Sequence, residues 1–141
     1  MASPLKVSEA VSLAFHATAL LASGPGRALS ARDIAGVLGA SEAHLAKVLR
    51  RLTKAGMVHS TVGPKGGYVL ARPSDKVLLQ EVYETIEGPL TPLRCLFGTP
   101  VCLGKFCIFR SSLEDVDKRL RDWLANTRLS DLSQVFAVEE V

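Results

Sequence analysis

Three cysteines, Cys95, Cys102 and Cys107, lie within a span of thirteen residues, and the chain contains no others. Thiolates are soft ligands that suit iron–sulfur clusters, Zn²⁺ or Cu(I). An odd number of clustered cysteines fits a reducing cytoplasm better than a disulfide framework. The spacing therefore predicts a cytoplasmic soft-metal site. A structural zinc and a metal-free thiol switch stay open as alternatives, although a closed zinc site prefers four firm ligands.

The charge along the chain is uneven. The whole sequence of 141 residues carries a formal net charge of +3, but residues 41–72 carry +5 and residues 73–141 carry −3. A basic block followed by an acidic one indicates a polyanion partner for the first and a protein partner for the second. The length allows one domain with an appended element.

The basic block begins with the pattern of two short helices. Ser30 and Ser41 are expected N-caps, and Gly39 closes the first helix. The second helix, 41–55, has apolar residues at steps of three and four. Two short helices joined by a tight glycine-containing turn predict a helix-turn-helix. An apolar helix at 7–22 precedes it, with His16 expected in the core; this run is too short to span a bilayer, so no membrane partner is expected.

A hairpin and two further helices follow. Residues 57–62 and 68–70 are expected strands around a glycine-rich tip, which makes a winged helix. Helix 77–87 is stopped by Gly88 and Pro89. At 108–127 a near-heptad stripe predicts a dimerisation helix, or alternatively a helix packed on its own domain. The expected fold is mainly α with a small β-hairpin wing, divided into a winged helix-turn-helix domain (1–88), a cysteine-containing cluster-binding loop (89–107), and a dimerisation helix with its tail (108–141).

Double-stranded DNA is the polyanion that such a unit binds. Side chains near the start of the second helix are expected at base edges, and Lys47 could donate to guanine O6 or N7. Basic side chains further along, and on the wing, are expected at phosphates, where each makes binding more salt-sensitive. A merely solvated basic face is the alternative, but charge, helix spacing and wing together favour DNA. The predicted DNA-binding residues are Ser41, Ala43, His44, Lys47, Arg50, Arg51, Lys54 and Lys65.

The block LxRLxKAGxV…GPxGGY, here Leu49 to Tyr68, resembles the IscR/NsrR type of winged-helix regulator, and the resemblance extends to Leu132. It implies a dimeric, nucleoid-associated bacterial transcription factor on a palindromic operator. It also implies an iron–sulfur cluster on the three cysteines, with [2Fe-2S] favoured over [4Fe-4S]. In one branch of the family a histidine fills the fourth coordination position of the cluster. That position falls on Arg110 here, and arginine cannot ligate. Another branch uses a carboxylate from the first helix of the partner subunit, which falls on Glu9. The wing arginine of the family falls on Val62.

Taken together, the sequence predicts a homodimeric transcriptional regulator whose operator affinity depends on an iron–sulfur cluster. An enzyme is not expected, because the chain has neither a phosphate cradle nor a catalytic triad motif. A small iron–sulfur electron carrier or interaction module without DNA binding is the third class, and the basic helix and wing argue against it.

Overall fold

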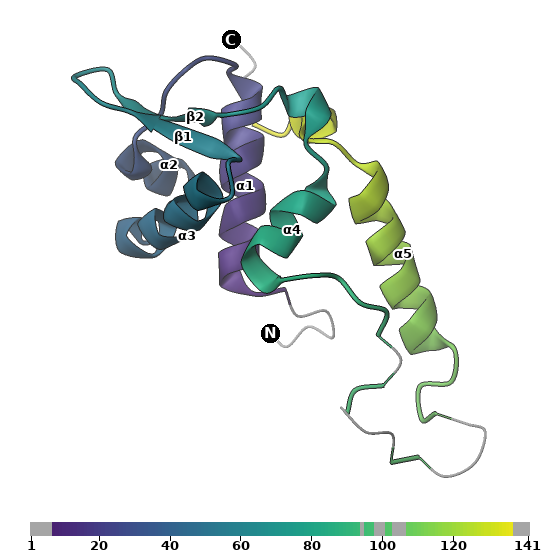
Figure 1. Cartoon of the computed structure of the whole chain (residues 1–141). Coiled ribbons are helices and arrows are strands. Elements are labelled where there is room, and N and C mark those ends of the chain that lie inside the picture. The colour runs from purple at the N-terminus through teal and green to yellow at the C-terminus, as the bar shows by residue number, and fades with distance from the viewer. Residues whose placement is uncertain (1–6, 94, 98–100, 103–106, 137–141) are drawn as a thin grey trace.

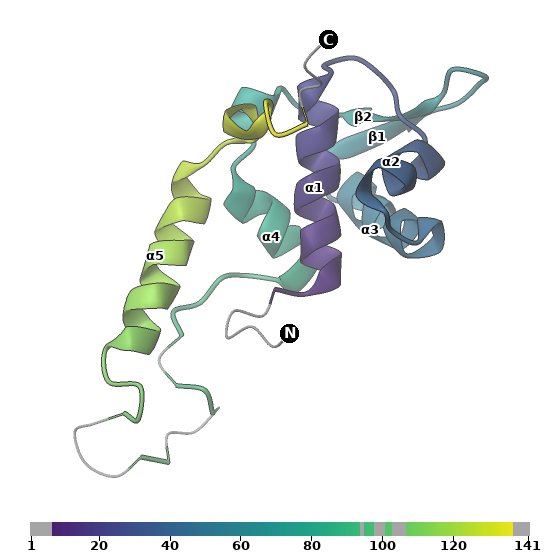
Figure 2. The same cartoon turned by 180° about the vertical axis from the view of Figure 1, so that it is seen from behind.

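Helix α1 (Glu9–Ser23) runs through the middle of the molecule. Figures 1 and 2 show α2, α3 and the β-hairpin on one side of it, and α4 and then α5 on the other. The computed structural model describes residues 7–93, 95–97, 101–102 and 107–136. The elements that follow α1 are α2 (Ala31–Leu38), α3 (Glu42–Lys54), β1 (Val58–Thr61), β2 (Gly67–Leu70), the 3₁₀ turn η1 (Ser74–Lys76), α4 (Leu79–Glu87), α5 (Ser112–Asn126) and the 3₁₀ turn η2 (Leu129–Leu132). The expected winged-helix fold is confirmed.

The two helices of the helix-turn-helix begin where the sequence predicts. Ser30 and Asp33 form a reciprocal capping box at the start of α2, and Gly39 ends α2 in the left-handed conformation. The Ser41 hydroxyl oxygen accepts the N–H of His44 at 3.3 Å at the start of α3. The apolar stripe of α3 then packs inward, with Leu45, Val48, Leu49 and Leu52 buried in the core.

The wing is a two-stranded antiparallel hairpin that gains a third partner from the α1–α2 connection. Val58 pairs with Leu70, and Leu29 forms a bridge with Tyr68 through two backbone hydrogen bonds of 3.1 and 2.7 Å. The close approach explains Gly67, because a Cβ atom there would lie 2.5 Å from the carbonyl carbon of Leu29. The hairpin is therefore fixed against the α1–α2 connection at the end of its strands nearest the turn, and the turn itself projects outward (Figure 1).

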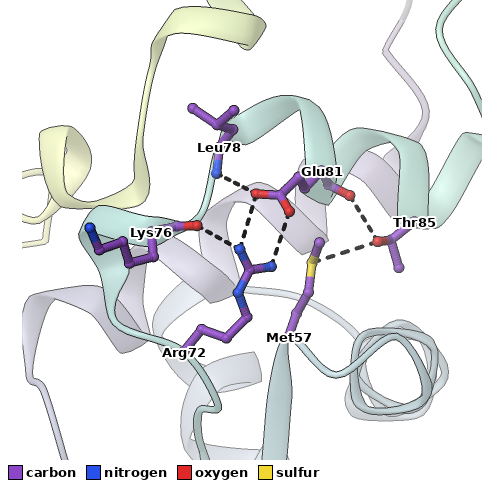
Figure 3. Close-up of polar contacts among 6 residues, drawn as sticks. All are labelled: Met57, Arg72, Lys76, Leu78, Glu81 and Thr85. Atoms are coloured by element: carbon purple, nitrogen blue, oxygen red, sulfur yellow. Dashed lines mark hydrogen bonds and ion pairs between the residues drawn. The ribbon is translucent and has the colours of Figure 1, made fainter.

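Arg72, just beyond β2, fastens the wing to α4 (Figure 3). Its guanidinium donates to the Lys76 carbonyl at 2.6 Å and to Glu81 at 3.0 Å. Glu81 also accepts the N–H of Leu78 at 2.9 Å. Burial raises the pKa of Glu81, but the hydrogen bonds from Leu78 and Arg72 outweigh it and hold the pKa below its usual range. Glu81 is thus an ionised anchor for both the wing and the start of α4.

Helix α4 starts at Leu79, two residues later than the predicted 77, because Val77 and Leu78 are used as extended backbone. Leu78 forms a bridge with Arg128, and two hydrogen bonds of 2.9 Å join Leu79 to Thr127 and Leu129 to Val77. The side chain of Leu129 is completely buried. The chain after α5 therefore returns to the core.

Helix α5 packs beside α4 and leaves part of its apolar stripe uncovered. Val116 is 58% exposed and Trp123 49% exposed, whereas Leu124, outside the predicted stripe, is buried. His16 is exposed, contrary to the core position expected for it, and its Nδ1 lies 2.6 Å from the Ser12 carbonyl oxygen. Among the residues that the structure describes, no helix is long and apolar enough to cross a membrane.

Candidate nucleic-acid interface and cysteine segment

The outward face of α3 has three basic side chains at helical spacing. Lys47, Arg50 and Lys54 are exposed, and within the described part of the chain none of them makes a hydrogen bond or an ion pair. Lys65 is exposed near the tip of the wing, and Val62 beside it is fully exposed. These cations have no intramolecular role there, so they are available for a polyanion.

The start of α3 lies against the start of α1. The Nδ1 atom of His44 is 3.5 Å from a carboxylate oxygen of Glu9, whose side chain is 74% exposed. The side chain of His44 is 36% exposed, so it sits at the edge of the outward face. Ala43 is exposed on that face as well. One predicted metal ligand thus lies next to one predicted base-reading residue within the same subunit.

Arg51 differs from the other basic residues of α3 because its guanidinium is already engaged. Its Nη2 donates to the backbone carbonyl of Ile86, in the last turn of α4. The carbonyls of a last helical turn have no partner within the helix, so this donor satisfies one of them. Of the predicted DNA-binding residues, Arg51 is therefore the one that the structure uses internally as a cap for another helix.

The three cysteines lie between α4 and α5. Cys102 is exposed, and Cys95 and Cys107 are half-buried. The backbone N–H groups of Phe97 and Phe109 donate to the Cys95 and Cys107 sulfurs, each at 3.4 Å. Hydrogen bonds to sulfur tune iron–sulfur sites. The donor set therefore fits a soft metal chemically.

The described residues of the cysteine segment (89–107) are not arranged as a closed metal site. Among the described residues, no three His, Cys, Asp or Glu side chains are close enough together to hold a metal ion. Glu9 contacts His44 of its own subunit. Whether the four predicted ligands meet stays a prediction, because binding would have to gather the cysteines and bring in a carboxylate from a second subunit.

The cysteine segment is tied to α5 by a carboxylate. The N–H of Leu93, two residues before Cys95, donates to Asp117 at 3.0 Å, and the same carboxylate oxygen accepts from Arg121 at 2.8 Å. Large apolar side chains are exposed along the segment and α5: Leu93, Leu96, Phe97, Val101, Ile108, Phe109, Val116 and Trp123. These side chains leave apolar surface uncovered on the segment and on α5.

Three of these contacts carry no clear signal in the sequence. The Glu9–His44 pair, the Arg51–Ile86 hydrogen bond and the Leu93–Asp117 hydrogen bond each join residues at least 24 positions apart. Helical periodicity and capping patterns report neighbours within a few residues, so they could not indicate such pairs. The basic character of Arg51 predicted a phosphate contact in place of the cap.

Comparisons with known proteins agree with this geometry. The profile of the Rrf2 family, described as iron-dependent transcriptional regulator, matches residues 7–134. A putative HTH-type transcriptional regulator of Aquifex aeolicus is 30% identical over 132 residues, which are 91% of each chain. The HTH-type transcriptional regulator IscR of Xenorhabdus nematophila is 31% identical over 101 residues, which are 71% of this chain and 61% of that protein.

Solved structures give the same result for the fold. CymR of B. subtilis, titled the global cysteine regulator, superposes with a TM-score of 0.77 at 26% identity, covering 94% of this chain and 99% of CymR. IscR of T. potens superposes with a TM-score of 0.72 at 28% identity, covering 96% of this chain and 94% of that IscR. The neighbours thus include a protein titled a cysteine regulator and a protein titled IscR.

Proposed function

The chain belongs to the Rrf2 family of transcriptional regulators, and from this premise we propose that it binds a specific operator with an affinity set by an iron–sulfur centre on Cys95, Cys102 and Cys107. As a member of that family it is a DNA-binding regulator and not an enzyme. The observation that best supports the finer proposal is the segment between α4 and α5, where all three thiols of the chain lie and two accept backbone N–H donors.

The outward face of α3 is the proposed reading surface. Its first turns, with Ser41, Ala43, His44 and Lys47, would enter the major groove, where a lysine can donate to guanine. Arg50 and Lys54 in α3 and Lys65 on the wing would contact phosphates. The exposure of these three cations, without internal partners among the described residues, supports that assignment.

A second copy of the chain is the proposed partner of α5. Val116, Leu120 and Trp123 line a hollow of about 310 Å³ on the side of the helix. Exposed apolar side chains are also found in the cysteine segment. A two-fold dimer through α5 would cover both and would present two copies of α3 to a palindromic operator.

Cys95, Cys102 and Cys107 would hold the cluster, and a [2Fe-2S] centre is proposed over [4Fe-4S], with Glu9 of a second subunit as the fourth ligand. When bound, such a centre supplies a group that reacts with oxidants or nitric oxide. The chain's own residues would transmit a change at the cysteines to the helices. The cysteine segment is joined to α5 through Asp117 and to α4 directly along the backbone. A coupling of about 1–3 kcal/mol would change operator affinity about 5–150-fold.

The proposal is tested with Cys102→Ala, using Val101→Ala as the matched control, because the neighbouring side chain is also exposed but has no sulfur. Both proteins and the parent are purified without oxygen, and their visible spectra and binding to a selected operator duplex are measured. We expect iron–sulfur absorption in the parent and the control only, together with an operator affinity in Cys102→Ala that no longer responds to nitric oxide. Equal affinities for all three proteins under every condition would exclude cluster control.

A metal-free thiol switch is the second candidate, favoured by the exposure of Cys102 and by the separation of the described thiols. It predicts a colourless parent protein whose DNA affinity changes with peroxide and recovers with a reductant. A structural zinc predicts a colourless protein with one equivalent of zinc. Metal analysis of the anaerobic parent separates the three cases.

A further inference from the structure

Arg50 and Arg51 are neighbours in α3 with identical side chains, but the structure gives them different surroundings. Arg50 lies on the outward face with Lys47 and Lys54, and it has no hydrogen-bond or ion-pair partner among the described residues. Arg51 donates from Nη2 to the carbonyl of Ile86, 35 positions away in the chain. The two residues therefore offer a matched pair, with one guanidinium facing solvent and the other facing α4.

The carbonyl that Arg51 meets belongs to the end of a helix. Ile86 is in the last turn of α4, and its side chain is buried at 5% exposed. The carbonyls of that turn carry the negative end of the helix dipole, which a cation stabilises. The hydrogen bond therefore has a charged donor, which makes it stronger than one between neutral groups. It fixes the last turn of the recognition helix against the last turn of α4.

The end of α4 is also where the cysteine segment departs. Gly88 turns the chain away, and its N–H bonds to the Glu84 carbonyl at 2.9 Å. Five residues later the N–H of Leu93 is held by Asp117 of α5, and Cys95 follows. On the other side, the Ser8 hydroxyl at the start of α1 donates to Glu87. Figure 2 shows the lower ends of α1 and α4 lying together where this segment starts. The junction thus joins α1, α3 and the cysteine segment.

We propose that Arg51 is a positioning residue, not a phosphate contact: through Ile86 it sets the placement of α3 relative to the start of the cysteine segment. A change in that segment then reaches the recognition helix through a contact of one side chain with one carbonyl. The regulatory half of this inference rests on the proposed function, whereas the placement of Arg51 does not. Arg50 has the phosphate role.

The experiment compares the full-length parent with Arg50→Ala, Arg51→Ala and Arg51→Lys. The probe is a duplex selected from a random pool by the parent protein. Binding is measured at several KCl concentrations, with each protein either loaded with ferrous iron and sulfide or treated with a chelator. Arg51→Met, which keeps the aliphatic stem and removes the donors, replaces Arg51→Ala if circular dichroism shows that the alanine variant is unfolded.

Arg50→Ala is expected to reduce the slope of log K for DNA binding against log salt concentration by about one, as loss of one phosphate contact does. It is expected to keep the parent's ratio of DNA affinities between the iron-loaded and the chelator-treated protein. Arg51→Ala is expected to keep the parent's slope and to bring that ratio close to one. Arg51→Lys, which retains a charged donor, is expected to restore part of the ratio. A slope reduced by one in Arg51→Ala, or a ratio unchanged from the parent, overturns the inference.

If the parent binds DNA equally when loaded with iron and when treated with the chelator, the proposed cluster control fails. The positioning role of Arg51 is then judged separately by amide hydrogen exchange. Faster exchange at residues 87–93 in Arg51→Ala than in Arg50→Ala supports the positioning role. Equal exchange at those amides in the two variants overturns it.

Discussion

Helices α3 and α5 are both amphipathic, but the chain covers only one of them. Leu45 and Leu49 of α3 are completely buried, while Val116 and Trp123 of α5 remain about half exposed. Of the residues in α5, only Leu124 is buried. An apolar stripe therefore shows that a helix needs a partner surface, and the structure decides whether that surface is within the same chain.

The difference assigns separate tasks to the two sides of α1. The side with α2, α3 and the wing is packed by residues of this chain, so its stability should be a property of one subunit. The side with α5 and the cysteine segment leaves apolar surface uncovered, so its stability should depend on association. Substitutions on each side of α1 separate these two sources of stability.

The largest effect is expected in the covered helix. Leu49→Ala removes a completely buried side chain and should lower the free energy of unfolding by about 2–5 kcal/mol. Urea denaturation followed by circular dichroism measures this loss. The loss should be similar at low and high protein concentration. A loss that appears only when the protein is dilute would place α3, too, at an interface between subunits.

A smaller effect is expected in the uncovered helix. Val116→Asp puts a charge on the apolar side of α5 and should raise the dissociation constant of the proposed dimer at least about tenfold, or about 1.4 kcal/mol. Sedimentation equilibrium measures it. Val62→Asp is the control, because it makes the same change at another exposed valine, on the wing. Equal weakening by both substitutions, or by neither, would contradict a dimer through α5.

The smallest effect concerns the anchor of the wing on the covered side. Glu81→Gln should lower the free energy of unfolding at pH 7 by up to about 1 kcal/mol, because it removes the ion pair with Arg72. The folded pKa of Glu81 lies below its ordinary value of 4.5, so this stabilisation is present above pH 4.5 and is lost as the pH falls through the folded pKa.

The free energies of unfolding of the parent and Glu81→Gln should therefore differ at pH 7 and converge as the pH falls through the folded pKa of Glu81. Glu84→Gln is the control on the same helix, since Glu84 accepts from Gln80 and forms no ion pair in the described chain. A difference between parent and Glu81→Gln that persists in acid would show that packing, not charge, is responsible.

Local features of the fold follow from the sequence because they depend on near neighbours. Ser30, Ser41 and Gly39 cap helices as predicted, and the hairpin turns where its glycines lie. The start of α4 was misplaced by two residues because Leu78 is held by Arg128, fifty positions further on. A tertiary contact here overrides the helical pattern of Val77 and Leu78.

The candidate site is predictable in part for the same reason. Outward placement of Lys47, Arg50 and Lys54 follows from helical spacing and is confirmed as a geometry. The hydrogen bond of Arg51 depends on a carbonyl in another helix, and the contact of Glu9 depends on how α1 crosses α3. Charge and spacing give no information about either, because both sides of α3 contain basic or titratable residues.

The backbone pairing of Leu78 with Arg128 closes the chain between them into a loop whose two ends lie together. Two backbone hydrogen bonds of 2.9 Å join the ends of this loop, and the side chain of Leu129 is buried in the core beside them. A protease that cut the chain next to the exposed Cys102 would therefore nick the polypeptide without releasing either fragment. The two fragments would stay associated in the native protein and would separate only in a denaturant.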